Sequence, residues 1–248
     1  MKIESFPRKL FLFRNNLCMF AQTQNELHNM KHMSILAVSL LALVACTPEK
    51  KQEADYSQYV NPMIGTDFTG NTYPGAQVPF GMVQLSPDNG LPGWDRISGY
   101  FYPDTTIAGF SHTHLSGTGA GDLYDISFMP VTRPYKEAPA PLGIYSTFSH
   151  NDEAASAGYY RVLLKDYNIN VELTATERCG IQRYTFPEAE ASVFLNLKKA
   201  MNWDFTLDSK IEVVDSTTIR GYRLSQGWSP LQHVYFETRP TDWVKRNK

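Results

Sequence analysis

From residue 59 onward the chain repeats one pattern, a short apolar or alternating run followed by a cluster of Gly, Pro, Asn or Asp. Runs that recur roughly every eight to twelve residues are typical of short strands joined by turns. Beyond the segment 34–45, no stretch keeps a helical apolar period over three turns, so only short helical turns are expected, near Glu153 or Lys198. The sequence therefore predicts an all-β protein, an antiparallel β-sandwich with a loop-rich first half and few short helices. The expected strands are 80–85, 125–131, 158–165, 169–175, 179–186, 191–197, 211–214, 218–223 and 233–238.

The composition limits the class of partner. Hydrophobic residues make up 42% of the 248 residues, which is enough for a packed core. The formal net charge is −2, and no basic cluster precedes the last few residues. Nucleic-acid binding is therefore not expected, because it needs a concentrated positive surface. A neutral partner is indicated, and the abundant aromatic residues could stack on sugar rings, although most are expected in the core.

A targeting segment is recognisable near the start. The apolar run 34–45 follows a short basic stretch and is too short to cross a bilayer, so residues 30–45 are interpreted as a signal peptide. Leu43-Val44-Ala45-Cys46 resembles the bacterial lipobox, in which the cysteine is lipidated and becomes the mature N-terminus. We therefore expect an exported protein, held at the bacterial outer membrane or in the periplasm by a lipid anchor on Cys46.

The rest of the chain divides around this segment. Residues 1–29 precede the signal peptide and resemble no targeting element, so they are interpreted as a mis-assigned upstream extension. Residues 46–58 are polar and charged, as in a flexible tether. The folded domain is expected at 59–238, and residues 239–248, which lose all alternation, are interpreted as an aberrant or truncated tail.

Structural packing roles, rather than sugar binding, are predicted for one cysteine and three tryptophans. Cys179 is then the one cysteine of the folded region, so no intrachain disulfide is expected there, and its side chain is predicted to be a small buried hydrophobe. Trp203, Trp228 and Trp243 lie in less loop-dense contexts than Trp94. Core packing or a domain contact is predicted for each of the three.

The segment 109–122, G-F-S-H-T-H-L-S-G-T-G-A-G-D, places two histidines beside a glycine-dense turn. In an extended backbone His112 and His114 project from the same side, so they could address one ligand together. A hydrogen-bonded surface pair is the alternative, because no third metal ligand lies at a fixed spacing. A further alternative is a cupin-type enzyme in which the two histidines and a nearby carboxylate bind an ion.

Two other loops offer groups that sugars need. Gly65, Thr66 and Asp67 combine backbone donors with a carboxylate, although Asp67 could instead cap its own turn. Trp94 could stack on a sugar while Asp95 and Arg96 form a bidentate pair or contact hydroxyls; alternatively, Trp94 plugs the end of the sandwich. Several carboxylates could serve acid–base chemistry, but their spacing selects no pair, so no catalytic residue or metal ligand is assigned. They are Asp67, Asp88, Asp95, Asp104, Asp122 and Asp125.

Five segments together resemble the N-terminal domain of glycoside hydrolase family 92. They are Y-V-N-P-M-I-G-T at 59–66, N-T-Y-P-G-A at 71–76, P-F-G-M-V-Q-L-S-P-D at 79–88, G-Y at 99–100 and G-F-S-H-T-H-L-S-G-T-G at 109–119. The resemblance covers 59–238. It implies an exo-acting α-mannosidase, in many members α-1,2-specific, of the kind found in gut Bacteroidetes.

The resemblance also implies an architecture and a division of labour. Family members place an N-terminal β-sandwich against a C-terminal α/α-barrel, with a calcium-dependent, inverting active site between them. The general acid, the general base and most calcium ligands come from the C-terminal domain, which this chain is expected to lack. The sandwich is expected to contribute Gly65, Thr66 and Asp67 to the mannose and Trp94 to the neighbouring sugar, with His112 and His114 on the same interdomain face.

The first hypothesis is therefore the N-terminal substrate-site domain of a secreted exo-α-mannosidase that acts on mannose-containing glycans and is inactive alone. The second is a stand-alone carbohydrate-binding surface lipoprotein. In the first case an apolar and aromatic patch should be exposed where the partner domain is missing.

Overall fold

The computed structural model describes residues 54–117 and 119–240, and the structural statements below concern these residues. The predicted extension 1–29, signal peptide 30–45, lipidated Cys46 and Trp243 lie outside them, as do most of the predicted tether and tail. No helix in the described part of the chain is both long enough and apolar enough to span a bilayer.

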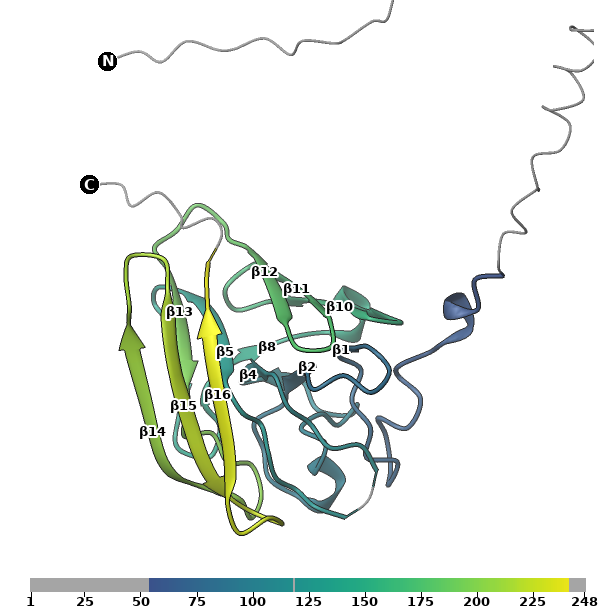
Figure 1. Ribbon diagram of the computed structural model, residues 1–248. Helices are drawn as coiled ribbons and strands as arrows, with labels where there is room; N and C mark the ends of the chain where they lie inside the picture. Colours follow the sequence, from purple (N-terminus) through teal and green to yellow (C-terminus); the bar gives the residue numbers. More distant parts are fainter. Residues whose placement is uncertain (1–53, 118, 241–248) are drawn as a thin grey trace, which may run out of the picture. The chain divides into compact units, whose positions relative to one another are not determined.

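The described residues form short strands and three short 3₁₀ helices (Figure 1). The strands are β1 Ala76–Gln77, β2 Gln84–Asp88, β3 Thr106–Ile107, β4 Gly109–Ser111, β5 Ser127–Thr132, β6 Glu137–Ala138, β7 Gly143–Ile144, β8 Ser146–Thr147, β9 Glu153–Ser156, β10 Tyr159–Leu164, β11 Ile169–Ala175, β12 Gly180–Thr185, β13 Ala191–Asn196, β14 Phe205–Val213, β15 Ile219–Gln226 and β16 Gln232–Thr238. The 3₁₀ helices are η1 Ser57–Tyr59, η2 Trp94–Arg96 and η3 His150–Asp152.

The strands assemble into three larger sheets. One sheet has the order β1-β2-β4-β5-β13, the second β12-β11-β10-β9 and the third β14-β15-β16; the pairs β3-β8 and β6-β7 stand apart. All of these pairings are antiparallel. In Figure 1 the third sheet stands at the left and β10 to β12 lie at the upper right. The prediction of an all-β antiparallel fold is confirmed.

The hydrophobic core lies between the five-stranded and four-stranded sheets. Alternate residues of β10 and β11 face it and pair across the strands: Tyr160 with Leu173, Val162 with Val171 and Leu164 with Ile169. Leu85 of β2 and Phe110 of β4 enter from the opposite sheet. Burying such a side chain contributes about 1.5–3 kcal/mol each, so this alternation accounts for the pairing of the two layers.

Most predicted strands are present, with shifted ends. The segment predicted at 80–85 becomes a strand only at Gln84, because Phe80 is exposed and has a φ of 60°. The predicted strand 211–214 is the end of β14, which already begins at Phe205. The helical turn near Glu153 is confirmed as η3, whereas no helix is assigned at Lys198.

The burial predicted for Cys179 is wrong, because Cys179 is exposed. It lies in the tight turn between β11 and β12, where the Thr176 N–H donates to the Cys179 carbonyl at 2.8 Å. The Cys179 N–H donates to Thr176 Oγ1 at 3.2 Å. Among the described residues, no other sheet packs over this turn between two adjacent strands, so the side chain of Cys179 faces water.

Core packing is also wrong for two tryptophans. Trp203 is 45% exposed and Trp228 80% exposed. Trp203 lies in the connection from β13 to β14, and Trp228 lies in the turn between β15 and β16. Both positions are outside the two packed layers, so only the domain-contact alternative stays open for them.

Candidate functional site

The second face of the five-stranded sheet is buried but polar. Ser86 and Asp88 alternate with Leu85 on β2, and Ser111 pairs with Ser86 from β4. A Cβ on Gly99 would approach Asp88 Oδ1 to 2.8 Å, so the loop that follows η2 lies directly on this face. Buried polar groups are costly unless they are paired, and the pairing organises the site.

Asp88 is paired with a lysine and a histidine. Its Oδ1 accepts from His114 Nε2 at 2.9 Å and from Ser111 Oγ at 3.1 Å, and Lys199 Nζ lies 3.2 Å from Oδ2. His114 Nδ1 faces the Gln84 carbonyl at 2.7 Å. Both nitrogens of the His114 ring therefore have polar partners. Burial raises the pKa of Asp88, but Lys199 and His114 outweigh it and hold that pKa below its ordinary value.

Arg223, from the middle of β15, fills the other half of the polar face. It is fully buried and donates to Asp125 Oδ1 at 2.6 Å and to Asp204 Oδ2 at 2.9 Å. It also donates to the carbonyls of Leu123 and Lys199, at 2.9 and 3.0 Å. Burial raises the pKa of Asp204 and outweighs the lowering effect of its contact with Arg223. Arg223 thus joins the third sheet to two loops beneath it.

The loop held by Arg223 has an unusual backbone. Leu123, Tyr124 and Ile126 adopt positive φ angles of 87°, 57° and 55°. This conformation costs roughly 1–2 kcal/mol per non-glycine residue. The carbonyl bond from Arg223 and the bond from the Tyr124 hydroxyl to the Ile97 carbonyl, 2.5 Å long, hold it in place. Strain of this kind accumulates at functional sites.

The loop at Gly65, Thr66 and Asp67 is closed on itself. Gly65 has a φ of 83°, and a Cβ there would meet the Thr72 side chain at 2.9 Å. Thr66 is buried, and its carbonyl accepts from the Tyr102 N–H at 2.8 Å. Asp67 Oδ1 accepts from the next backbone N–H at 2.7 Å. The carboxylate therefore caps its own turn, as in the alternative considered from the sequence.

Trp94, Asp95 and Arg96 form η2, but the predicted Asp95–Arg96 pair is wrong. Arg96 instead donates to both oxygens of Asp104, at 2.6 and 2.5 Å. Asp104 lies one loop further along, so spacing gave no signal for this choice. Trp94 is 52% exposed and stacks on Trp203, with ring centroids 6.3 Å apart and planes at 27°. It does not plug the end of the sandwich.

The two histidines do not converge on one ligand. His112 Nδ1 lies 2.7 Å from the Ile126 carbonyl, and a Cβ on Gly180 would come within 2.6 Å of the ring. Burial lowers the pKa of His112. The His114 ring makes its bonds around Asp88 instead. Each ring is a satisfied interior group.

Metal ligation finds no support in residues 54–117 and 119–240, where no group of three or more His, Cys, Asp or Glu is placed to hold an ion. The cupin-type alternative therefore lacks its third ligand there.

Tyr102 is a site residue that the sequence did not reveal. Its backbone joins the loop of Thr66, and its ring stacks on His150 at 3.9 Å and 9°. His150 Nδ1 contacts Glu153 Oε2 at 2.7 Å, and Glu153 Oε1 accepts from the buried Tyr160 hydroxyl at 2.6 Å. This chain of contacts ties the site loops to the core. Elsewhere on the surface, Trp94 and Trp203 are exposed and stacked on one another, and exposed rings with hydrogen-bonding groups nearby suit a hydroxylated ligand.

Comparison with known proteins gives consistent results. A family model described as the glycosyl hydrolase family 92 N-terminal domain matches residues 59–243. One similar solved structure is that of the family GH92 α-mannosidase BT3965 from Bacteroides thetaiotaomicron in complex with mannoimidazole, with 43% sequence identity and a TM-score of 0.69. The matched region covers 73% of this chain and 24% of the BT3965 chain. The structure of the family GH92 inverting mannosidase BT2199 from the same species has 27% sequence identity and a TM-score of 0.55. That match covers 79% of this chain and 24% of the BT2199 chain.

A curated relative, an "Uncharacterized secreted glycosidase" of Arthroderma benhamiae, is 26% identical over 172 residues, which are 65% of this chain and 21% of that protein. The chain thus spans about a quarter of the length of the solved relatives and a fifth of the curated one.

Proposed function

The chain belongs to glycosyl hydrolase family 92, whose N-terminal domain it contains, and we propose that residues 59–238 are the substrate-contacting domain of a secreted, calcium-dependent, inverting exo-α-mannosidase. The observation that carries this proposal, beside the family match, is the exposed Trp94 in η2, which Arg96 ties to Asp104; the neighbouring Tyr102 N–H donates to the Thr66 carbonyl. In this proposal Trp94 stacks on the sugar next to the terminal mannose. Gly65 to Asp67 line the mannose itself, and His114 supports the loops from below.

The domain by itself does not hydrolyse glycosides in this proposal. An inverting glycosidase needs one carboxyl group as acid and another as base, on opposite sides of the bond. Asp88, Asp125 and Asp204 are buried and already paired with Lys199, His114 or Arg223, so they are not free for either role. The acid, the base and the calcium ligands would come from the α/α-barrel domain that makes up the remaining family length.

The proposed location is the bacterial cell envelope, with Cys46 as the lipid anchor and a mannose-containing glycan as the ligand. The curated relative's name supports secretion. A second candidate, a stand-alone carbohydrate-binding surface lipoprotein, is favoured by the closed pairing of the polar face. Asp88 and Asp125 find their cations within the described residues, so this face needs no partner domain.

Titration of the chain with α-1,2-mannobiose in the presence of calcium tests both candidates. We expect saturable binding, seen as a change in tryptophan fluorescence, without release of mannose. Trp94→Ala should weaken binding about tenfold, since loss of a stacked ring costs on the order of 1 kcal/mol. The matched control is Tyr235→Ala, which removes an exposed ring from the outer face of β16.

Release of mannose by the chain alone would contradict the proposed inactivity. Absence of binding, or equal loss in the Trp94 and Tyr235 variants, would contradict the proposed sugar site.

A further inference from the structure

Three exposed tryptophans, Trp94, Trp203 and Trp228, are carried by loops whose backbones are joined through Asn202 and Asp122. The sequence pattern did not reveal this connection. The Gly93 N–H donates to Asn202 Oδ1 at 3.0 Å, which places Trp94 beside Trp203. A Cβ on Gly121 would come within 2.8 Å of Asn202, so the next loop lies against the same amide. The neighbour of Gly121 is Asp122, whose Oδ2 accepts from the Trp228 N–H at 2.7 Å.

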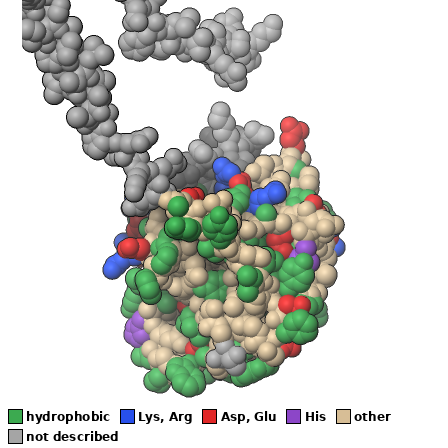
Figure 2. Space-filling model, turned by 90° about the vertical axis from the view of Figure 1, so that its right-hand side faces the viewer, with side chains coloured by type: hydrophobic (Ala, Val, Ile, Leu, Met, Phe, Trp, Pro, Cys, Tyr) green, Lys and Arg blue, Asp and Glu red, His purple; other side chains and the backbone are tan. Residues whose placement is uncertain are grey.

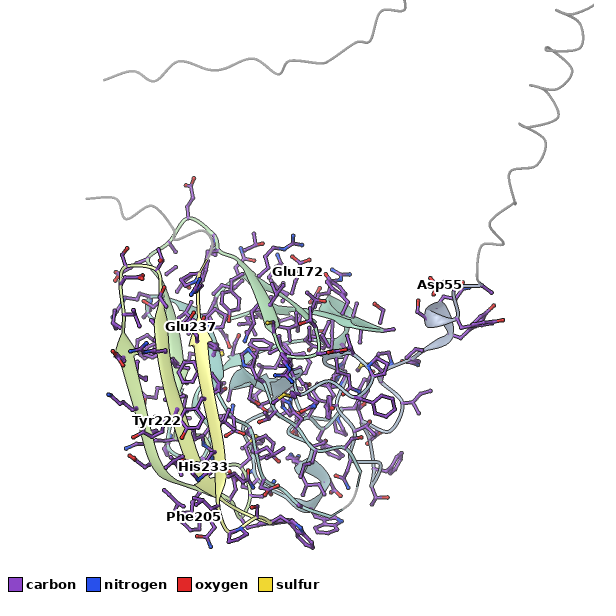
Figure 3. All side chains as sticks on the ribbon, in the orientation of Figure 1. Asp55, Glu172, Phe205, Tyr222, His233 and Glu237 are labelled. Carbon is purple, nitrogen blue, oxygen red and sulfur yellow. The ribbon has the colours of Figure 1, made fainter. Side chains whose placement is uncertain are left out.

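This support fixes the backbones that carry the rings. Asp122 is buried, and its Oδ2 also accepts from Gln232 Nε2 at 2.8 Å. A Cβ on Gly227 would lie 2.3 Å from that oxygen, so the turn before Trp228 has no room for a side chain. The exposed rings are therefore presented by ordered backbone. We call Trp94, Trp203 and Trp228 the aromatic end; Figure 3 shows Phe205 and His233, which flank it in sequence, at one end of the third sheet.

The surroundings of the aromatic end are polar and present little charge at the surface. Its loops are 91–96, 119–124, 200–206 and 226–232. Their one cation, Arg96, is paired with Asp104, and of their three carboxylates Asp122 and Asp204 are buried and Asp95 is half-buried. Asn202, Gln226 and Ser229 supply amide and hydroxyl groups. Figure 2 views the molecule from the right-hand side of Figure 1, and on that face most of the visible Lys and Arg side chains lie in the upper part. Flat rings among neutral hydrogen-bonding groups suit an uncharged polyol rather than an anion.

We propose that Trp203 and Trp228 extend the sugar-binding surface beyond Trp94, so that the domain contacts mannose residues further from the cleaved bond and favours longer glycans. This inference rests on the proposed function, and it adds that the preferred ligands are glycans longer than a disaccharide. Trp94 accounts for one sugar ring, and the two further indoles offer flat area that a disaccharide leaves uncovered.

Calorimetric titration of the 248-residue chain with α-1,2-linked mannobiose and with the linear mannotetraose tests the inference. We expect the tetraose to bind about tenfold more tightly than the biose. Trp228→Ala should reduce that ratio about fivefold and change the biose Kd less than twofold. Trp94→Ala should weaken both sugars, and Tyr235→Ala neither. Thermal melts of each variant confirm that the comparison is made on folded protein, and Trp228→Phe should retain most of the ratio.

Binding of the biose without any length dependence would overturn this inference and leave the proposed function standing. Binding of neither sugar would overturn both. If Trp228→Ala abolished self-association in sedimentation and left both sugar affinities unchanged, the aromatic end would be a protein contact and the inference would be wrong.

Discussion

The two faces of the five-stranded sheet are both buried, but they are held by different physics. On one face Leu85 and Phe110 meet the alternating apolar residues of β10 and β11. On the other face Asp88 is paired with Lys199 and His114, and in the loops beside it Asp125 and Asp204 are paired with Arg223. The stability of the apolar face depends on the volume of its side chains, so each methyl group that is removed lowers the stability by a similar increment. The stability of the polar face depends on paired charges, so the removal of one partner leaves the other charge buried without a counterion.

The largest expected effect comes from stranding charges on the polar face. Arg223→Met leaves Asp125 and Asp204 buried without a cation and should lower the free energy of unfolding by about 3–5 kcal/mol, measured by urea denaturation. Arg220→Met, on the same strand, removes an exposed pair with Glu212 and should cost about 0–1 kcal/mol. The triple variant Arg223→Met, Asp125→Asn, Asp204→Asn should recover part of the loss. If the triple variant were the least stable, the stranded-charge explanation would be wrong.

The core face should respond in proportion to the volume removed. Leu173→Ala, at a fully buried position of β11, should cost about 3 kcal/mol because it removes buried methyl groups and leaves a cavity. Ile181→Ala on β12, at an exposed position, should cost less than about 0.5 kcal/mol. The same denaturation series measures both. Equal losses would show that β11 is not the layer that closes the core.

The smallest expected effect is a pH dependence of opposite sign at two carboxylates of the polar face. The pKa of Asp88 is lowered in the folded protein, so its contribution is present above the ordinary value of 3.8 and is lost as pH falls through the folded pKa. The pKa of Asp204 is raised, so its contribution is present below 3.8 and is lost as pH rises through the folded pKa. A tenfold difference in acid dissociation constant between the folded and unfolded chain corresponds to about 1.4 kcal/mol.

Urea denaturation between about pH 3 and pH 7 measures this difference. The deficit of Asp88→Asn relative to the natural sequence should be largest at neutral pH and shrink in acid. Asp204→Asn should instead gain on the natural sequence as pH rises from acid toward neutrality. Parallel pH profiles for the two variants would contradict the opposite roles of these carboxylates.

The sequence predicted the core face well and the polar face poorly, for a physical reason. The strand at 169–175 has the predicted ends because its alternation is a local signal. The start of β14 was missed because an irregularity between Thr206 and Asp208 breaks the alternation. Asp88 and Asp125 were recognised as candidate carboxylates. Their partners Lys199 and Arg223 lie far along the chain, and no local sequence pattern indicates that these residues pair with them.

The site loops show the same division. The family resemblance drew attention to Gly65 to Asp67, Trp94 and the two histidines, yet spacing could not show that Arg96 pairs with Asp104 or that Trp203 stacks on Trp94. The exposed positions of Trp203 and Cys179 follow from where their turns fall relative to the layers. Residue type favoured burial for both, and tertiary position decided otherwise.

Arg223 also sets an order in time. Its hydrogen bond to Asp125 joins residues 98 positions apart, and the bond from Trp228 to Asp122 spans 106. A ribosome adds about 5–20 residues per second, so these carboxylates emerge roughly 5–20 s before the groups that donate hydrogen bonds to them. The core strands β10 and β11 have already left the ribosome by then. During synthesis the nascent chain therefore passes through a stage with a formed apolar layer and an open, anionic underside, which only the arrival of the third sheet closes.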